Sequence, residues 1–89
     1  MYFHIGNDHV VRLKDVVGVF DMDNTTISRS GRKFLSVAQK NGEIVEAAGD
    51  GLPRSYVVTE RGGRVRVYLS ALSSQTLLKR ANAGAAALK

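Results

Sequence analysis

The sequence predicts a small α+β domain with a largely antiparallel sheet, one central helix and one C-terminal helix. Three observations lead to this class. Short runs rich in β-branched residues are separated by Gly, Asn and Asp, the residues typical of tight turns. One amphipathic helical pattern interrupts these runs, and a second follows the last of them. The 89 residues suffice for one domain and not for two.

The first part of the chain predicts three strands, at residues 2–5, 9–14 and 16–20. The first two alternate apolar and polar positions on either side of a Gly-Asn-Asp turn. The third is a continuous apolar run, which is typical of a buried strand. Gly18 lies inside this run and indicates a bulge or the close approach of another backbone.

A helix is predicted from about residue 28 to residue 41, after a polar loop over residues 21–26. The sequence Asn41-Gly42 ends it, because glycine accepts the left-handed conformation that follows a helix. Its apolar positions recur at helical spacing and are expected to face the core: Ile27, Phe34, Leu35 and Ala38.

The second half predicts three further strands, at residues 43–47, 55–59 and 64–69. Gly62-Gly63 indicates a hairpin between the last two strands, because the tightest hairpin turns need positive φ at both central residues. Ser73 is expected to cap a short final helix with Leu77 and Leu78 inward. Residues 82–89 are rich in Ala and Gly and either extend this helix or are disordered, so a single domain is expected over residues 1–81.

The composition favours an anionic partner and a reducing compartment. Thirteen Lys and Arg residues oppose eight Asp and Glu residues, and the resulting net charge of +5 attracts polyanions. There is no cysteine, which excludes disulfides and thiolate metal sites. No signal peptide is recognised, and no apolar run approaches the roughly 18 residues of a membrane span. We therefore expect a soluble, cytoplasmic protein that does not associate with membranes.

No motif predicts catalysis. His4 and His9 lie on neighbouring predicted strands, but no third ligand has a clear spacing, so ordinary edge-strand histidines are the simpler interpretation. The segment Asp21-Met22-Asp23 resembles the start of a calcium loop, yet Thr26 and Arg32 stand where such a loop needs Gly and Glu. We predict a protein that is not an enzyme and has no cofactor, no metal and no small-molecule substrate.

Basic residues form two groups. One is a stripe without acidic residues along the predicted central helix, made of Arg29, Arg32, Lys33 and Lys40. In the other, Arg64 and Arg66 share one side of a strand with Tyr68, while Arg61 is at the hairpin turn and Arg54 precedes the neighbouring strand. Both groups suit contacts with nucleic-acid phosphates. A solvated helix face and a strand charged against aggregation explain them equally well, so both interpretations stay open.

Three stretches, taken in order and spacing, resemble the RemB branch of the RemA/RemB family of bacterial extracellular-matrix gene regulators. They are residues 1–8 (MYFHIGND), residues 15–21 (DVVGVFD) and residues 53–80, from PRSYVVT to LSALSSQTLLKR. The resemblance covers residues 1 to about 81. It implies a cytoplasmic DNA-binding regulator of biofilm-matrix genes that assembles into rings around which DNA bends.

The resemblance carries over to some basic residues only. Arg32-Lys33 matches a basic pair of RemA proteins, Arg54 matches an arginine of the loop before a strand, and an early RemA arginine falls near Lys14-Asp15. This chain has Gly51-Leu52 where RemA proteins have an arginine doublet, which puts an identical mode of DNA contact in doubt.

The first hypothesis is therefore an oligomeric DNA-binding regulator whose partners are double-stranded DNA and further copies of itself, in a ring or another oligomer. Its expected phosphate contacts are Lys14, Arg29, Arg32, Lys33, Arg54, Arg64 and Arg66. The alternative is a protein-interaction module that acts as a co-regulator without direct DNA binding. A third reading is a metal- or ligand-binding domain that uses His4 and His9.

Overall fold

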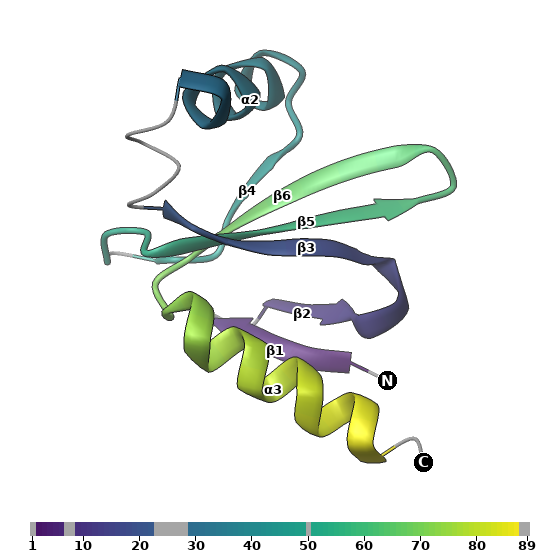
Figure 1. Ribbon diagram of the computed structural model, residues 1–89. Coiled ribbons are helices and arrows are strands. Elements are labelled where there is room, and N and C mark those ends of the chain that lie inside the picture. The colour runs from purple at the N-terminus through teal and green to yellow at the C-terminus, as the bar shows by residue number, and fades with distance from the viewer. Residues whose placement is uncertain (1, 7–8, 23–28, 50, 88–89) are drawn as a thin grey trace.

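A computed structural model describes residues 2–6, 9–22, 29–49 and 51–87, together with their side chains except those of residues 29–31 and 83–87. The elements are β1 (Tyr2–Gly6), β2 (His9–Arg12), the 3₁₀ turn η1 (Leu13–Asp15), β3 (Val16–Asp21), α2 (Arg29–Lys40), β4 (Ile44–Glu46), β5 (Ser55–Arg61), β6 (Arg64–Ser70) and α3 (Ser74–Ala87). Figure 1 shows them in layers, with α2 on one side of the larger sheet and the β1–β2 ribbon and α3 on the other.

The described strands form two sheets. β1 and β2 pair as a two-stranded antiparallel ribbon, and the other four strands have the order β3-β5-β6-β4. β5 is antiparallel to β3 and to β6, whereas β4 is parallel to β6. Because β3 and β4 lie at opposite edges, the connection through α2 crosses one face of the sheet. The predicted α+β class is confirmed, and the single expected sheet is corrected to two.

The larger sheet has a hydrophobic core on each face, because successive strand residues point to opposite sides. The core beneath α2 consists of Ala38, Tyr56, Val58, Val67 and Leu69. The core towards the ribbon and α3 consists of Phe3, Ile5, Val11, Ala47, Val57 and Leu77. Tyr56 and Val57 illustrate the alternation, since these neighbours belong to different cores. A chain of this size thus shares its apolar residues between two thin layers.

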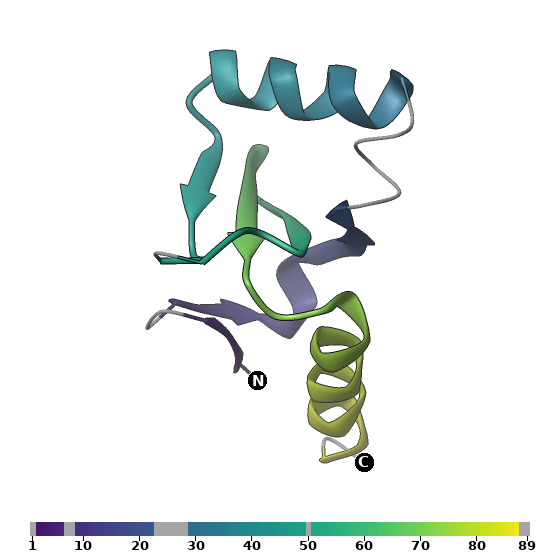
Figure 2. The ribbon, with the colours of Figure 1, turned by 90° about the vertical axis from the view of Figure 1, so that its left-hand side faces the viewer.

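Side-chain hydrogen bonds from Ser70 and Arg80 connect the ribbon to β6 and to α3. The fully buried Ser70 hydroxyl donates a hydrogen bond to the carbonyl oxygen of Ile5 in β1. Arg80 of α3 reaches the same strand, where its Nη1 lies 3.1 Å from the carbonyl oxygen of His4. The ribbon is therefore held from β6 and from α3, and α3 continues to Ala87 beyond the ribbon (Figure 2).

Several local predictions are confirmed. Gly62 and Gly63 have φ values of 58° and 82° and form the hairpin turn between β5 and β6. The pairing of β3 with β5 shifts register between Val16 and Gly18, as the glycine inside the apolar run indicated. Ser73 caps α3, with the backbone nitrogen of Thr76 3.2 Å from its hydroxyl oxygen. Each of these features has a cause within a few residues of sequence.

Other expectations are wrong in part. The second strand ends at Arg12 and not at residue 14, because the chain turns through η1 to leave the ribbon and join the larger sheet. Phe34 was expected in the core but is 40% exposed, since it stacks at the rim on Tyr56 with ring centroids 6.1 Å apart. Leu78 is exposed, and only Leu77 points inward. The predicted core residue Ile27 lies outside the described residues.

Candidate nucleic-acid interface

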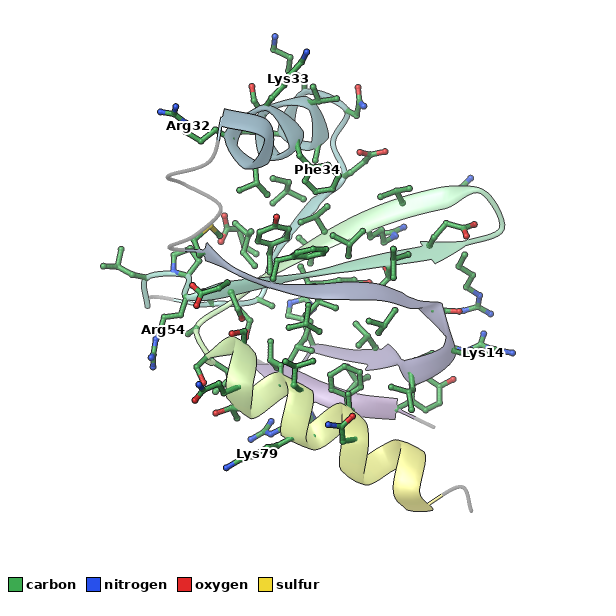
Figure 3. All side chains as sticks on the ribbon, in the orientation of Figure 1. Lys14, Arg32, Lys33, Phe34, Arg54 and Lys79 are labelled. Carbon is green, nitrogen blue, oxygen red and sulfur yellow. The ribbon has the colours of Figure 1, made fainter. Side chains whose placement is uncertain are left out.

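Arg32 and Arg54 lie at the same end of the molecule, on either side of Met22. The backbone nitrogen of Met22 donates to the carbonyl oxygen of Arg54 at 3.0 Å. Arg32 and Met22 both line a groove of about 360 Å³ beneath α2. Both arginine side chains are exposed, and Figure 3 shows them at the end of the larger sheet where β3 ends and β5 begins. Lys33 is exposed at the outer surface of α2.

Arg64 and Arg66 point to the other face of the sheet, towards the β1–β2 ribbon. They alternate along β6 with Val65 and Val67, of which Val67 belongs to the core beneath α2. The same alternation places Tyr68 on the ribbon side, where it packs against the second core. The sequence prediction that these three residues share one side is confirmed. Their separation from Arg32 by the thickness of the sheet was not expected.

Lys14 and Arg29 complete the predicted set. Lys14 is exposed in η1, and Figure 3 shows it at the opposite end of the molecule from Arg54. Arg29 is the first residue of α2, but its side chain is not among those described. The described members of the predicted set therefore do not form one continuous patch within a single protomer. Arg32 and Arg54 lie at the end near Met22, Lys33 lies on the outer surface of α2, and Arg64 and Arg66 face the ribbon.

The hairpin region contains a cleft of about 310 Å³ between the two sheets. Four arginines line it, from three strands: Arg12, Arg61, Arg64 and Arg66. The cleft is also lined by Tyr2, Val10, Val11, Asp15, Thr59 and Tyr68. The pairing register sets Arg61 directly opposite Arg64, and Thr59 opposite Arg66. A compact group of positive charges thus faces a concave surface, which we name the arginine cleft.

Two of the four arginines in the arginine cleft, Arg12 and Arg61, were absent from the predicted set of phosphate contacts. Arg61 was detectable, because the Gly62-Gly63 turn fixes the hairpin register and places residue 61 opposite residue 64. Arg12 was not, because it belongs to the other sheet and reaches the cleft only through the packing of the ribbon.

Few of the described basic side chains have an acidic partner among the described residues. The one ion pair found there joins Arg12 Nε and Asp15 Oδ2 at 3.8 Å. The nearest acidic residue in the hairpin, Glu60, instead accepts a hydrogen bond from the backbone nitrogen of Gly63 at 3.0 Å. Arginines without a carboxylate partner keep their donors available for an anionic ligand.

The histidines do not converge on a common site. His4 is exposed in β1 and pairs with Val10, whereas His9 pairs with Gly6 at the other side of a register shift. The ring of His9 lies against that of Tyr68, with centroids 6.3 Å apart. Within the described ranges, no three His, Asp or Glu side chains gather in a way that suits a metal ion. The geometry therefore gives the metal-binding reading no support.

An exposed apolar face lies on the α2 side, at the edge of the larger sheet. Phe20 of the edge strand β3 is 42% exposed and stacks on Tyr56, with ring centroids 5.0 Å apart. Phe34 stacks on the same tyrosine, and Val37 on α2 is also exposed. We name Phe20, Phe34 and Val37 the aromatic edge. Exposed apolar groups next to an unpaired strand edge are typical of protein–protein contacts.

No described helix is long and apolar enough to cross a membrane.

Comparison with known proteins places the chain in a family. The family model described as "RemA-like: Extracellular matrix regulatory protein A-like" matches residues 2–81. The chain is 41% identical over 81 residues to extracellular matrix regulatory protein B of Bacillus subtilis (strain 168), covering 91% of this chain and 90% of that protein. The chain therefore belongs to the RemA-like family of extracellular matrix regulatory proteins.

Proposed function

We propose that this protein is a cytoplasmic, oligomeric DNA-binding regulator of extracellular-matrix genes and not an enzyme. The name of its Bacillus subtilis relative supports a regulatory role connected with the matrix. The proposed phosphate contacts are Lys14, Arg29, Arg32, Lys33, Arg54, Arg64 and Arg66. Its proposed partners are double-stranded DNA and further copies of the same chain.

The observation that carries this proposal is the excess of exposed basic side chains over ion pairs. Arg32, Lys33 and Arg54 are exposed, and the one ion pair among the described residues, that of Arg12, involves none of them. When exposed basic side chains without an acidic partner contact DNA phosphates, they displace counterions that are condensed on the DNA. The release of these counterions drives association without base-specific contacts. Specificity then comes mainly from the bending preferences of the DNA.

Self-association increases the number of phosphate contacts that the protein can make with one DNA duplex. The described contacts are spread over separate parts of the molecule, so one protomer offers few phosphate contacts in any one direction. Repetition of the Arg32 and Arg54 region around an oligomer multiplies these contacts and raises the affinity through avidity. The aromatic edge provides a suitable contact surface for this assembly.

The proposal is tested by the salt dependence of duplex binding. We expect the logarithm of affinity to fall linearly with the logarithm of salt concentration, with a slope of about −0.9 per neutralised phosphate. Arg32→Glu with Arg54→Glu is expected to make the slope shallower. Each single variant, Arg32→Glu or Arg54→Glu, is also compared with Lys79→Glu, which reverses one exposed charge on α3 outside both basic groups and is the matched control. A folded oligomer that fails to bind duplex DNA even at low salt contradicts the proposal.

The aromatic edge favours one alternative, a co-regulator that binds another protein and not DNA. Under this reading, Phe34→Ala abolishes capture of the partner while the basic variants have no effect. Phe34 suits this test because it is 40% exposed, so its removal costs little of the core. Sedimentation and duplex binding measured on the same variant separate the two functions, since only the DNA-binding reading links loss of assembly to loss of DNA affinity.

A further inference from the structure

The arginine cleft differs from the other basic region in the number of arginines that line a single hollow. It lies between the β5–β6 hairpin and the β1–β2 ribbon and has a volume of about 310 Å³. Small-molecule sites are concave and occupy about 300–1,000 Å³. Arg32, Lys33 and Arg54 instead project outward from the surface. The groove beneath α2 has a similar volume of about 360 Å³, but Arg32 is the one charged residue among its described lining residues, so the arginine cleft is the better match for a small ligand with several negative charges.

The charges of the cleft are arranged at a cost in stability. Arg61 and Arg64 are cross-strand partners, and like charges directly opposite each other destabilise a strand pair. Arg66 lies two residues further along the same face, and Arg12 approaches from the other sheet. The one acidic lining residue, Asp15, pairs with Arg12 and leaves the other three without a carboxylate. An anion with several oxygens relieves this repulsion and accepts their paired N–H donors.

Aromatic rings stand beside the arginines. Tyr2 is 62% exposed at the start of β1, and Tyr68 lines the cleft from β6. Thr59, opposite Arg66, has a hydroxyl group that lies 3.4 Å from the carbonyl oxygen of that arginine. An exposed tyrosine face is a stacking platform for a nucleobase. Neither ring is needed to bind a bare inorganic anion.

From this combination we propose that the arginine cleft binds a free nucleotide, with its phosphates on Arg61, Arg64 and Arg66 and its base against Tyr2. The site goes beyond the proposed regulatory function, which it supplements with a small-molecule ligand. Arg64 and Arg66 are also among the proposed DNA contacts, so the experiment has to separate a free nucleotide from the phosphates of a duplex. Asp15 limits the affinity, because its carboxylate repels the phosphates and engages Arg12.

The probe is ATP, titrated calorimetrically without divalent cations into the full-length protein at fixed ionic strength. We expect saturable binding that Arg66→Ala weakens by about tenfold or more, the loss typical of a charged hydrogen bond. Asp15→Asn is expected to strengthen binding, a change that misfolding does not produce. Tyr2→Ala is expected to weaken ATP binding and leave the binding of inorganic tripolyphosphate unchanged. Lys79→Ala removes one exposed positive charge on α3 and is expected to change the affinity by less than about twofold.

Three results overturn the proposal. One is the absence of ATP binding to protein with a native circular dichroism spectrum. Another is an equal loss in Arg66→Ala and Lys79→Ala, which indicates attraction to net charge only. The third is an equal loss of ATP and tripolyphosphate binding in Tyr2→Ala, which leaves no role for the base. Duplex DNA is expected to compete with ATP, because Arg64 and Arg66 are among the proposed contacts of both ligands. Because Arg32→Glu with Arg54→Glu tests duplex binding separately, failure of either proposal is seen independently of the other.

Discussion

The cross-strand pair Arg61 and Arg64 allows a direct test of whether the hairpin is less stable because it contains two facing positive charges that bind an anion. The two residues are the last cross-strand pair before the turn, and both are exposed. Arg61→Glu converts a repulsive pair into an attractive one without changing the turn. If the arginines are present for an anion, this substitution is expected to stabilise the fold while it weakens anion binding.

The size of the effect follows from the pair geometry. Cross-strand charge pairs contribute about 0.2–1 kcal/mol, and solvent screening places an exposed pair near the lower end of this range, at about 0.25 kcal/mol. Removing one repulsion and adding one attraction therefore stabilises the protein by about 0.5 kcal/mol. A domain of this size gains about 4–8 °C in Tm for each kcal/mol, so the expected rise is about 2–4 °C.

The assay is thermal unfolding followed by circular dichroism at one protein concentration, in low and in high salt. Arg61→Gln removes the repulsion without adding attraction and is expected to show about half of the rise. High salt should remove most of the difference between the variants, since it screens exposed charges. A fall in Tm for Arg61→Glu, or a rise that salt does not diminish, refutes the electrostatic reasoning.

Three further predictions concern single side chains. Leu52 is 87% exposed beside Arg54, at a position of the arginine doublet implied by the resemblance, so Leu52→Arg should strengthen duplex binding without altering Tm, as measured by anisotropy and melting. Leu77→Ala removes a fully buried side chain and should lower the free energy of unfolding by about 2–5 kcal/mol in urea denaturation, whereas the exposed neighbour Leu78→Ala should cost much less. The buried Ser70 hydroxyl donates a hydrogen bond to the carbonyl oxygen of Ile5 in β1 and accepts one from the backbone nitrogen of Leu72. Ser70→Ala should therefore lower the free energy of unfolding by about 1–3 kcal/mol and increase hydrogen exchange in β1.

What could be predicted from the sequence has causes within a few residues. The hairpin depends on two adjacent glycines with positive φ, and the start of α3 depends on the hydroxyl of Ser73. The alternation along β6 predicts that Arg64, Arg66 and Tyr68 lie on one face of the strand, and all three line the arginine cleft. These features need no knowledge of the rest of the chain, because turn, cap and strand geometry are local.

The sequence by itself thus determined the α+β class, the approximate element bounds, and which basic residues share a strand face or a helix. Only the tertiary structure decided that β2 ends at Arg12, that β4 joins β6 in parallel, and that the strands divide into two sheets. It also decided that Arg12 faces Arg64 and Arg66 across a cleft, while Arg32 lies on the other side of the sheet. The physical reason is that the choice of strand partner depends on apolar burial between residues distant in sequence, and local patterns do not encode it.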